Sequence, residues 1–161
     1  MSPPAPYGPM HMTDDLSARF RSVIDANLYM TLATADETGT PWASPVYFAH
    51  ADYVEYVWVS KPGARHSRNI AVRPQVGIVV FDSHAPINTG GGMYMEATAQ
   101  QLTGDDRLVA LEIFNARSIA HGGEAWGVDR VEEPAELRLY RAIASEHWVL
   151  DSRDLRVSIS V

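Results

Sequence analysis

The residues that could do chemistry in this chain are concentrated in one short segment. Five of its 19 Lys, Arg and His residues lie within residues 61–73, and Lys61 is the only lysine. The segment also carries hydroxyl and amide groups, and it reads Ser60-Lys61-Pro62-Gly63-Ala64-Arg65-His66-Ser67-Arg68-Asn69. It follows the aromatic and β-branched residues 53–59 and opens a short helical pattern. The first N–H groups of a helix lack intrahelical partners and lie at the positive end of its dipole, so the segment predicts a phosphate-binding site.

The side chains of this segment differ in how well they suit a phosphate. Arg65 is the strongest candidate, because its planar guanidinium can hold a phosphate with two hydrogen bonds. Ser60 and Ser67 could add hydroxyl groups, whereas Asn69 could equally hydrogen-bond the backbone. On one helix His66 points away from the other cations, so the four cannot all reach one ligand. The alternative to a binding site is a solvated helix face.

The overall composition limits the classes of partner. A net charge of −7 and a pI near 5.2 argue against nucleic acid or an anionic membrane as partner, because both require a broad basic face. The absence of cysteine excludes thiolate zinc sites, iron–sulfur clusters and cysteine nucleophiles. The six histidines show no metal-ligand spacing, and no G-x-S-x-G motif indicates a serine hydrolase. A small anionic ligand remains compatible with the sequence.

The chain is expected to be one domain behind a short leader. Residues 1–12 are rich in proline and lack the basic and apolar regions of a secretory signal, so we expect a disordered leader and a cytoplasmic protein. No apolar run reaches the ~18 residues of a membrane-spanning helix. Residues 13–161 show no repeat and no internal boundary, which predicts a single domain.

The periodicity of the chain predicts mainly strands. We expect helices at residues 13–27, 64–72 and from 103, and strands at residues 29–34, 42–49, 53–59, 75–81, 93–102, 137–150 and 155–161. Pro45 marks an edge or a bulge, residues 75–81 read as buried on both faces, and residues 137–150 should bend near 144–146. Most connections are too short for crossover helices, so the fold class is mainly β with α: six or seven antiparallel strands in a barrel with about three helices.

The order of these elements and the segment Ser60 to Pro74 resemble the pyridoxamine 5′-phosphate oxidase-like FMN-binding split-barrel family. The similarity runs from about residue 14 to residue 161. It implies a Greek-key split barrel that forms a homodimer, with FMN in a groove at the subunit interface. In some relatives the deazaflavin F420, haem or no cofactor takes that place. One departure is that the family usually has lysine three residues before Asn69, where this chain has His66.

The resemblance also implies where the cofactor would lie. Residues 43–47 and 57–60 would follow the flavin ring and ribityl chain, and the following helix start would hold the phosphate. The cofactor-binding residues expected in this way are Val46, Tyr47, Val59, Ser60, Lys61, Arg65, His66, Ser67 and Asn69. Trp42 and Trp148 could border the ring or pack in the core, and Trp58 favours the core. Catalytic residues are unassigned, because a flavin carries the hydride chemistry itself.

Three functions are compatible with the sequence. An FMN-dependent oxidoreductase acting on a small molecule is the first. An F420-dependent reductase is the second, because the acidic tail of F420 requires more exposed cations than this chain offers. A non-catalytic flavin or haem carrier or sensor is the third, since His66 replaces the usual lysine. Pyridoxamine phosphate oxidation itself is disfavoured, because only Arg153 and Arg156 could hold a second phosphate near the C-terminus.

Overall fold

The computed structural model describes residues 9–161, which form three α-helices, one short 3-10 helix and eight strands. Their bounds are α1 Pro9–Ala26, β1 Tyr29–Ala35, β2 Pro41–Tyr47, β3 Ala49–Ala51, β4 Glu55–Ser60, α2 Arg65–Val72, β5 Gln75–Phe81, β6 Gly92–Gln101, α3 Gly104–Ala120, η1 Val128–Arg130, β7 Arg138–Leu150 and β8 Arg156–Ser158. No helix within this part of the chain combines the length and apolarity needed to cross a bilayer.

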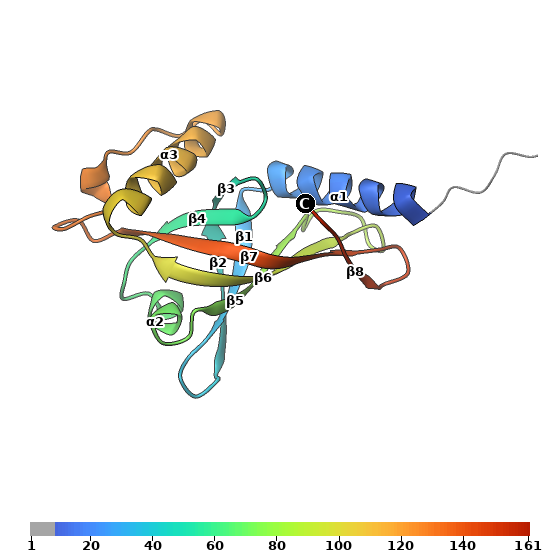
Figure 1. Cartoon of the computed structure of the whole chain (residues 1–161), viewed down its shortest axis with the longest axis horizontal. Coiled ribbons are helices and arrows are strands. Elements are labelled where there is room, and N and C mark those ends of the chain that lie inside the picture. The colour runs from blue at the N-terminus through green and yellow to red at the C-terminus, as the bar shows by residue number, and fades with distance from the viewer. Residues whose placement is uncertain (1–8) are drawn as a thin grey trace, which may run out of the picture.

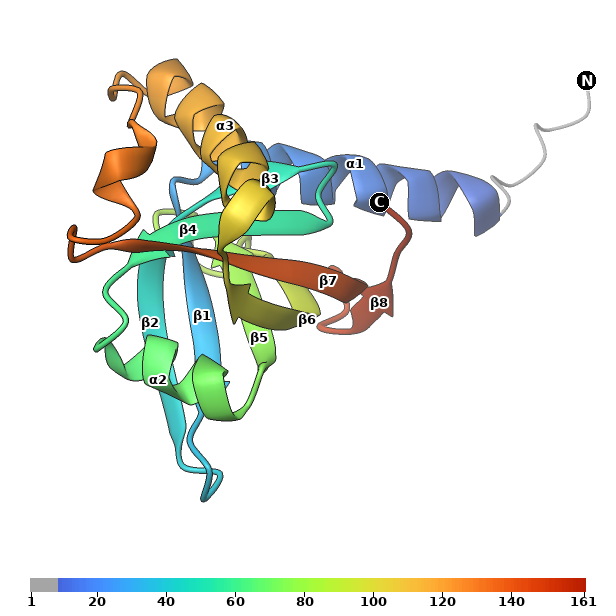
Figure 2. The same cartoon turned by 60° about the vertical axis from the view of Figure 1, so that its left-hand side comes forward.

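All strands belong to one curled antiparallel sheet. Its order is β2-β1-β5-β6-β7-β4-β3, and β8 pairs with the end of β7. α1 and α3 lie on one side of the sheet, whereas α2 lies on the other side against β1 and β6 (Figures 1 and 2). The expected mainly-β barrel with three helices is therefore confirmed. The strand count exceeds the expected six or seven, because Ala49–Ala51, mostly beyond the strand expected at 42–49, pairs with β4 as the separate strand β3.

Two hydrophobic clusters hold the layers together, and β4 contributes to both. Because side chains alternate along a strand, Tyr56 and Trp58 point into the barrel while Val57 lies beneath α3. α1 closes the barrel with Phe20 and Ile24, which are one turn apart and fully buried. Each such side chain stabilises the fold by about 1.5–3 kcal/mol. The expectation that Trp58 belongs to the core is confirmed.

The first helix begins earlier than expected. α1 starts at Pro9, so the predicted start at residue 13 was wrong by one helical turn. Proline is accepted in the first turn of a helix, because the first N–H groups have no intrahelical partner there. Residues 9–12 of the expected leader thus belong to α1, and residues 1–8 lie outside the described residues.

Two strand predictions need correction and one is confirmed. The strand expected at 42–49 ends at Tyr47, because the Phe48 N–H turns to the Leu28 carbonyl at 3.3 Å and leaves the ladder. β5 is buried at alternate residues rather than on both faces, because only its inner face meets the barrel core. Pro45 lies in β2, which is an edge strand, as predicted.

The longest strand carries a register shift where a bend was expected. Glu96 of β6 pairs with Glu146, but the next residue, Ala97, pairs with Ala144. Ser145 is therefore an extra residue in β7, which is the arrangement of a β-bulge. Bulges bend a strand and increase its twist, so this position explains how β7 pairs with β6 along most of its length while still reaching β4 and β8.

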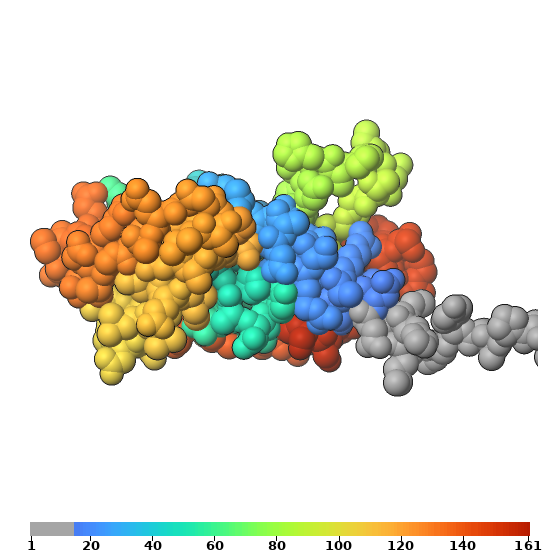
Figure 3. All heavy atoms as spheres, turned by 90° about the horizontal axis from the view of Figure 1, so that it is seen from above, coloured from blue at the N-terminus to red at the C-terminus, as the bar shows by residue number. Residues whose placement is uncertain are grey.

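A glycine at the start of β6 is favoured by lack of space. The connection between β5 and β6 stands out from the body of the molecule (yellow-green in Figure 3) and exposes 91% of Ile87. None of the glycines at residues 90–92 has a positive φ. A Cβ atom at Gly91 would meet the Arg19 guanidinium, which can move aside, whereas one at Gly92, the first residue of β6, would collide with the Tyr94 ring.

Candidate functional site

A cavity of about 630 Å³ lies between β2 and β4 on one wall and α3 with its following segment on the other. This volume is in the range of small-molecule and cofactor sites. The first wall consists of Leu28, Tyr29, Pro45, Val46, Tyr47, Val59, Ser60 and His66, and the second of Phe114, Ser118, His121, Gly123, Trp126 and Leu137. Five of the nine expected cofactor-binding residues line it: Val46, Tyr47, Val59, Ser60 and His66.

The hairpin of β1 and β2 positions the first wall. Its register pairs Tyr29 with Tyr47 at the end nearest the cavity. The alternation of β2 turns Val46 into the core and Tyr47 toward α3, where its ring meets Phe114 edge to face at 5.7 Å between centroids. β4 brings Val59 and Ser60 to the same wall immediately before the chain enters α2.

His66 is held between two serine hydroxyls. Its Nε2 lies 2.7 Å from the Ser60 Oγ, and its Nδ1 lies 3.2 Å from the Ser44 Oγ. Burial lowers the pKa of His66 below its ordinary value, so the imidazole is neutral near pH 7. His66 therefore orients Ser60 instead of presenting the positive charge that a lysine would bring. Ser44 was not predicted as part of this site, and no local sequence signal connects it with His66.

The other four expected residues do not line the cavity: Lys61 precedes α2, and Arg65, Ser67 and Asn69 belong to it. The Arg65 guanidinium stacks on the Trp42 ring at 4.5 Å, and Lys61 contacts Glu136 at 2.6 Å. Ser67 is buried on another side of α2, and the Asn69 amide donates to the Thr34 Oγ1 at 3.0 Å. The cations at the start of α2 therefore do not converge on one point.

The N-terminus of α2 has no side-chain cap. Its N-cap residue is Ala64, in an extended conformation, so the first-turn N–H groups have no side-chain acceptor. Ser60 lines both the main cavity and a neighbouring hollow formed by residues 61–64 and Glu136. The cavity wall thus continues into a helix start whose free donors and dipole favour an anion.

The second wall was missed by sequence reasoning. Phe114, Ser118 and His121 follow helical spacing along one face of α3, and this spacing could have indicated a shared surface. Trp126 is fixed to α3 through Asn115, whose side chain accepts from the Trp126 N–H at 2.8 Å and donates to its carbonyl at 2.9 Å. The segment that follows α3 therefore supplies an ordered part of the second wall.

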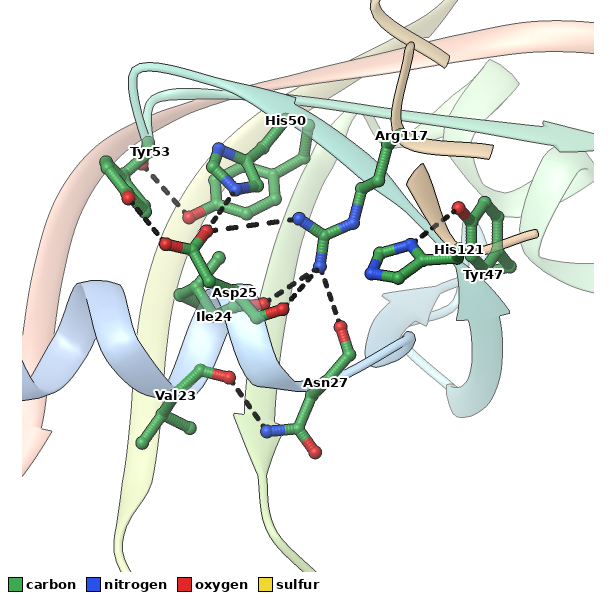
Figure 4. Close-up of polar contacts among 10 residues, drawn as sticks. Val23, Ile24, Asp25, Asn27, Tyr47, His50, Tyr53, Arg117 and His121 are labelled. Atoms are coloured by element: carbon green, nitrogen blue, oxygen red, sulfur yellow. Dashed lines mark hydrogen bonds and ion pairs between the residues drawn. The ribbon is translucent and has the colours of Figure 1, made fainter. Parts of the chain in front are cut away.

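Next to the cavity, Arg117 and Asp25 form a charged cluster that connects α1 with α3 (Figure 4). One Arg117 nitrogen donates to the carbonyls of Ile24 at 3.0 Å and Asn27 at 2.8 Å, which satisfies the C-terminal end of α1. The guanidinium also lies over the Phe48 ring. Burial lowers the pKa of Arg117, but the site still holds the cation because carbonyls and a carboxylate surround it.

Asp25 is the anionic centre of this cluster. It accepts from the Tyr53 hydroxyl at 2.8 Å and lies 3.0 Å from the His50 Nε2 (Figure 4). Burial lowers the pKa of His50, although the contact with Asp25 acts in the opposite direction. These contacts join α1 to the β3–β4 turn and leave the cluster outside the cavity lining.

Comparison with solved structures supports the split-barrel architecture. The haem storage protein HutZ from Vibrio cholerae is 21% identical, with a TM-score of 0.63, over 81% of this chain and 90% of that chain. A haem-binding protein from Mycobacterium smegmatis is 17% identical, with a TM-score of 0.69, over 88% and 56%. An FAD-binding protein from Mesorhizobium loti is 18% identical, with a TM-score of 0.58, over 83% and 90%. At these identities the likeness shows the fold alone.

The sequence family is more specific than these structural likenesses. The model of the pyridoxamine 5′-phosphate oxidase family matches residues 16–147, and the chain therefore belongs to this family. Comparison with curated protein sequences gives no match. The family assignment agrees with the resemblance carried by Ser60 to Pro74.

Proposed function

We propose that the protein binds FMN and, as a homodimer, acts as an FMN-dependent oxidoreductase on a small molecule. The observation that carries this proposal is the continuity at Ser60 between an aromatic-lined cavity and the uncapped start of α2. A flat ring fits the aromatic-lined cavity, and a phosphate fits the start of α2. When bound, FMN would supply the hydride chemistry, while the protein binds and orients the reactants.

The residues present suit the two ends of such a cofactor. Backbone groups of Val46, Tyr47 and Val59 border the part of the cavity that would take the ring edge. Ser60, Arg65 and the first-turn N–H groups of α2 would hold the phosphate. Among the described residues Arg65 forms no ion pair within 4 Å, so its guanidinium is available to an anion.

Lys61 can join the phosphate site if its present contact is exchanged. Both side chains of the Lys61–Glu136 pair are exposed, so solvent screens their attraction and the contact is easily exchanged. A phosphate dianion at the start of α2 would compete with the single charge of Glu136. Neutral His66 would add a hydrogen bond rather than a charge, which distinguishes this chain from relatives that carry lysine there.

A haem carrier is the second candidate. His66 and His121 bring two imidazoles to the cavity, and imidazole is a common axial ligand of haem iron. Two of the similar structures are described as haem storage or haem-binding proteins. The same cavity would then serve a cofactor that carries carboxylates instead of a phosphate tail.

The absorption spectrum of freshly purified protein separates these candidates. FMN gives two bands in the near-ultraviolet and blue, F420 gives a single band between them, and haem gives an intense Soret band. Mass spectrometry of the compound released by heating identifies it, and light scattering tests the homodimer. Titration with FMN then measures affinity. A colourless protein that does not bind FMN at micromolar concentration would overturn the proposed function.

A further inference from the structure

The cavity lining contains no formally charged residue. Among the described residues that border it, none is Lys, Arg, Asp or Glu. Its ionisable groups are two histidines and two tyrosines, and burial keeps His66 uncharged by lowering its pKa. Burial likewise raises the pKa of Tyr47, so its phenol keeps its proton at neutral pH. A charged ligand in this cavity would lose hydration without gaining a partner of opposite charge.

Two arginines next to the second wall are engaged outside the cavity lining. Arg117 directly precedes Ser118, which lines the cavity, but the Arg117 side chain points toward α1 (Figure 4). Its terminal nitrogens are engaged by backbone carbonyls of α1 and by the Asp25 carboxylate, and only 12% of this side chain is exposed. The Arg130 guanidinium stacks on the Trp126 ring, 3.8 Å from its centroid, and Arg130 does not line the cavity. The second wall therefore has no arginine in its lining.

What the second wall offers is a hydroxyl among aromatic rings. The Tyr47 Oη lies 3.3 Å from the His121 Nδ1, at the contact between β2 and the end of α3 (Figure 4). When Nδ1 carries the proton, His121 donates to the Tyr47 oxygen, and the phenol proton is left for a ligand oxygen. Phe114 and Trp126 border the same space, and their rings meet edge to face with 5.5 Å between centroids.

We propose that the α3 side of the cavity binds an uncharged, planar ring compound whose carbonyl oxygen accepts a hydrogen bond from Tyr47. The proposal rests on the proposed function insofar as the flavin ring takes the β2–β4 side and leaves the α3 side to the substrate. It names the substrate class of that site. It also states what the site rejects, which is a substrate carrying a phosphate or carboxylate at this position.

Coumarin and coumarin-3-carboxylate provide a matched pair of probes. Both are flat rings with a carbonyl oxygen, and they differ by one carboxylate that is ionised at pH 7. Isothermal titration calorimetry of the protein as purified, and again after saturation with FMN, measures both affinities without any turnover. We expect coumarin to bind at least about tenfold more tightly, because the carboxylate has no cation to pair with.

Tyr47→Phe tests the donor. Removal of one neutral hydrogen bond should weaken coumarin about three- to tenfold. Tyr94→Phe removes a hydroxyl from β6, outside the cavity, and should leave the affinity unchanged. The thermal transition of each variant shows that it is folded. Equal loss in both variants, or no loss in Tyr47→Phe, overturns the role of Tyr47.

The possible results separate this inference from the proposed function. If FMN does not bind but coumarin is still preferred, the cofactor assignment fails and the neutral subsite stands. If FMN binds but coumarin-3-carboxylate binds as tightly as coumarin, the cofactor assignment stands and the substrate class is wrong. Binding of FMN together with a preference for coumarin in both preparations supports the cofactor assignment and the substrate class.

Discussion

The cavity and the cluster around Arg117 are neighbours on α3, yet they handle charge in opposite ways. In the cluster, a buried guanidinium is surrounded by two carbonyls of α1 and the Asp25 carboxylate. In the cavity, the lining contains no Lys, Arg, Asp or Glu, and its polar contacts are between hydroxyls and imidazoles, such as Ser60 with His66 and Tyr47 with His121. Adjacent residues of α3 thus serve different purposes: Arg117 belongs to a structural charge cluster, and Ser118 lines the cavity.

This difference indicates how the fold keeps the Arg117 cation away from the cavity lining. An arginine near a binding site attracts anions unless its donors are already used. Here the C-terminal carbonyls of α1 use them, so the helix end and the arginine satisfy each other. The stability of the α1–α3 contact and the selectivity of the cavity therefore depend on the same side chain in different ways.

The strongest test of this comparison is Arg117→Met. The substitution keeps a similar apolar stem but leaves the α1 carbonyls and Asp25 without their donor, and we expect the free energy of unfolding to fall by about 2–3 kcal/mol. Half-exposed Asp25 can partly rehydrate, which limits the loss. Urea denaturation measures it, with Arg153→Met as a control that should cost less, because the Arg153 side chain is 60% exposed.

The same variant tests whether Arg117 contributes to ligand binding or only to the contact between α1 and α3. FMN and coumarin affinities should stay near those of the wild type, because the guanidinium does not line the cavity. An affinity loss above about tenfold in a variant that remains folded would show that Arg117 contributes to binding. The separation between the two regions would then be wrong.

The cation at the start of α2 is the next test. Arg65→Ala should weaken FMN binding by about 1.5–3 kcal/mol, because a charge-assisted hydrogen bond to phosphate is lost. Riboflavin, which lacks the phosphate, should bind the variant and the wild type alike. Fluorescence titration measures both ligands, and Arg156→Ala removes an arginine of β8 as a control. Unchanged FMN affinity removes Arg65 from the site.

The smallest expected effect is a pH dependence of stability. Burial lowers the pKa of His66 in the folded protein, whereas the unfolded chain titrates near its ordinary value of about 6.5. Below that pH the unfolded state binds more protons, so the free energy of unfolding decreases as the pH falls from 7 to 5. His50 and His147 act in the same direction, since burial also lowers their pKa.

His66→Gln should reduce this slope, because glutamine can hydrogen-bond the two serines without titrating. Denaturation midpoints at several pH values measure the slope, and His84→Gln, which replaces a histidine that is 96% exposed, should keep that of the wild type. An unchanged slope in His66→Gln would mean that His66 is not the neutral buried group described above.

The parts of the fold that could be predicted are those specified by local patterns. The β1–β2 hairpin, α2 and β5 follow from alternation, turn residues and the Arg73-Pro74 stop within a few residues of chain. The start of α1 was misplaced because a proline can be accommodated in a first turn. The division at Phe48 was missed because its cause is a hydrogen bond to Leu28, which no local periodicity reveals.

In the site, too, the residues specified by local sequence could be predicted, and those that depend on long-range contacts could not. Residues 60–69 could be singled out because a strand end and a helix start adjoin in sequence. The second wall could not, because the Tyr47–His121 contact joins residues 74 positions apart. For the same reason the pairing of Lys61 with Glu136, 75 positions away, was not foreseen. Such contacts depend on how the whole barrel closes.

The extra residue at Ser145 has a consequence for how the sequence of β7 can vary. Tyr140, Ala142 and Ala144 are buried before it, whereas His147 and Val149 are buried after it, so Ser145 marks a change of phase. Deleting Ser145 would join Ala144 directly to Glu146, and alternation would still leave Glu146 outward and His147 inward. One residue can therefore be lost at the bulge without changing which side chains face the barrel, whereas a loss elsewhere in the paired part of β7 would act as a frameshift in side-chain direction.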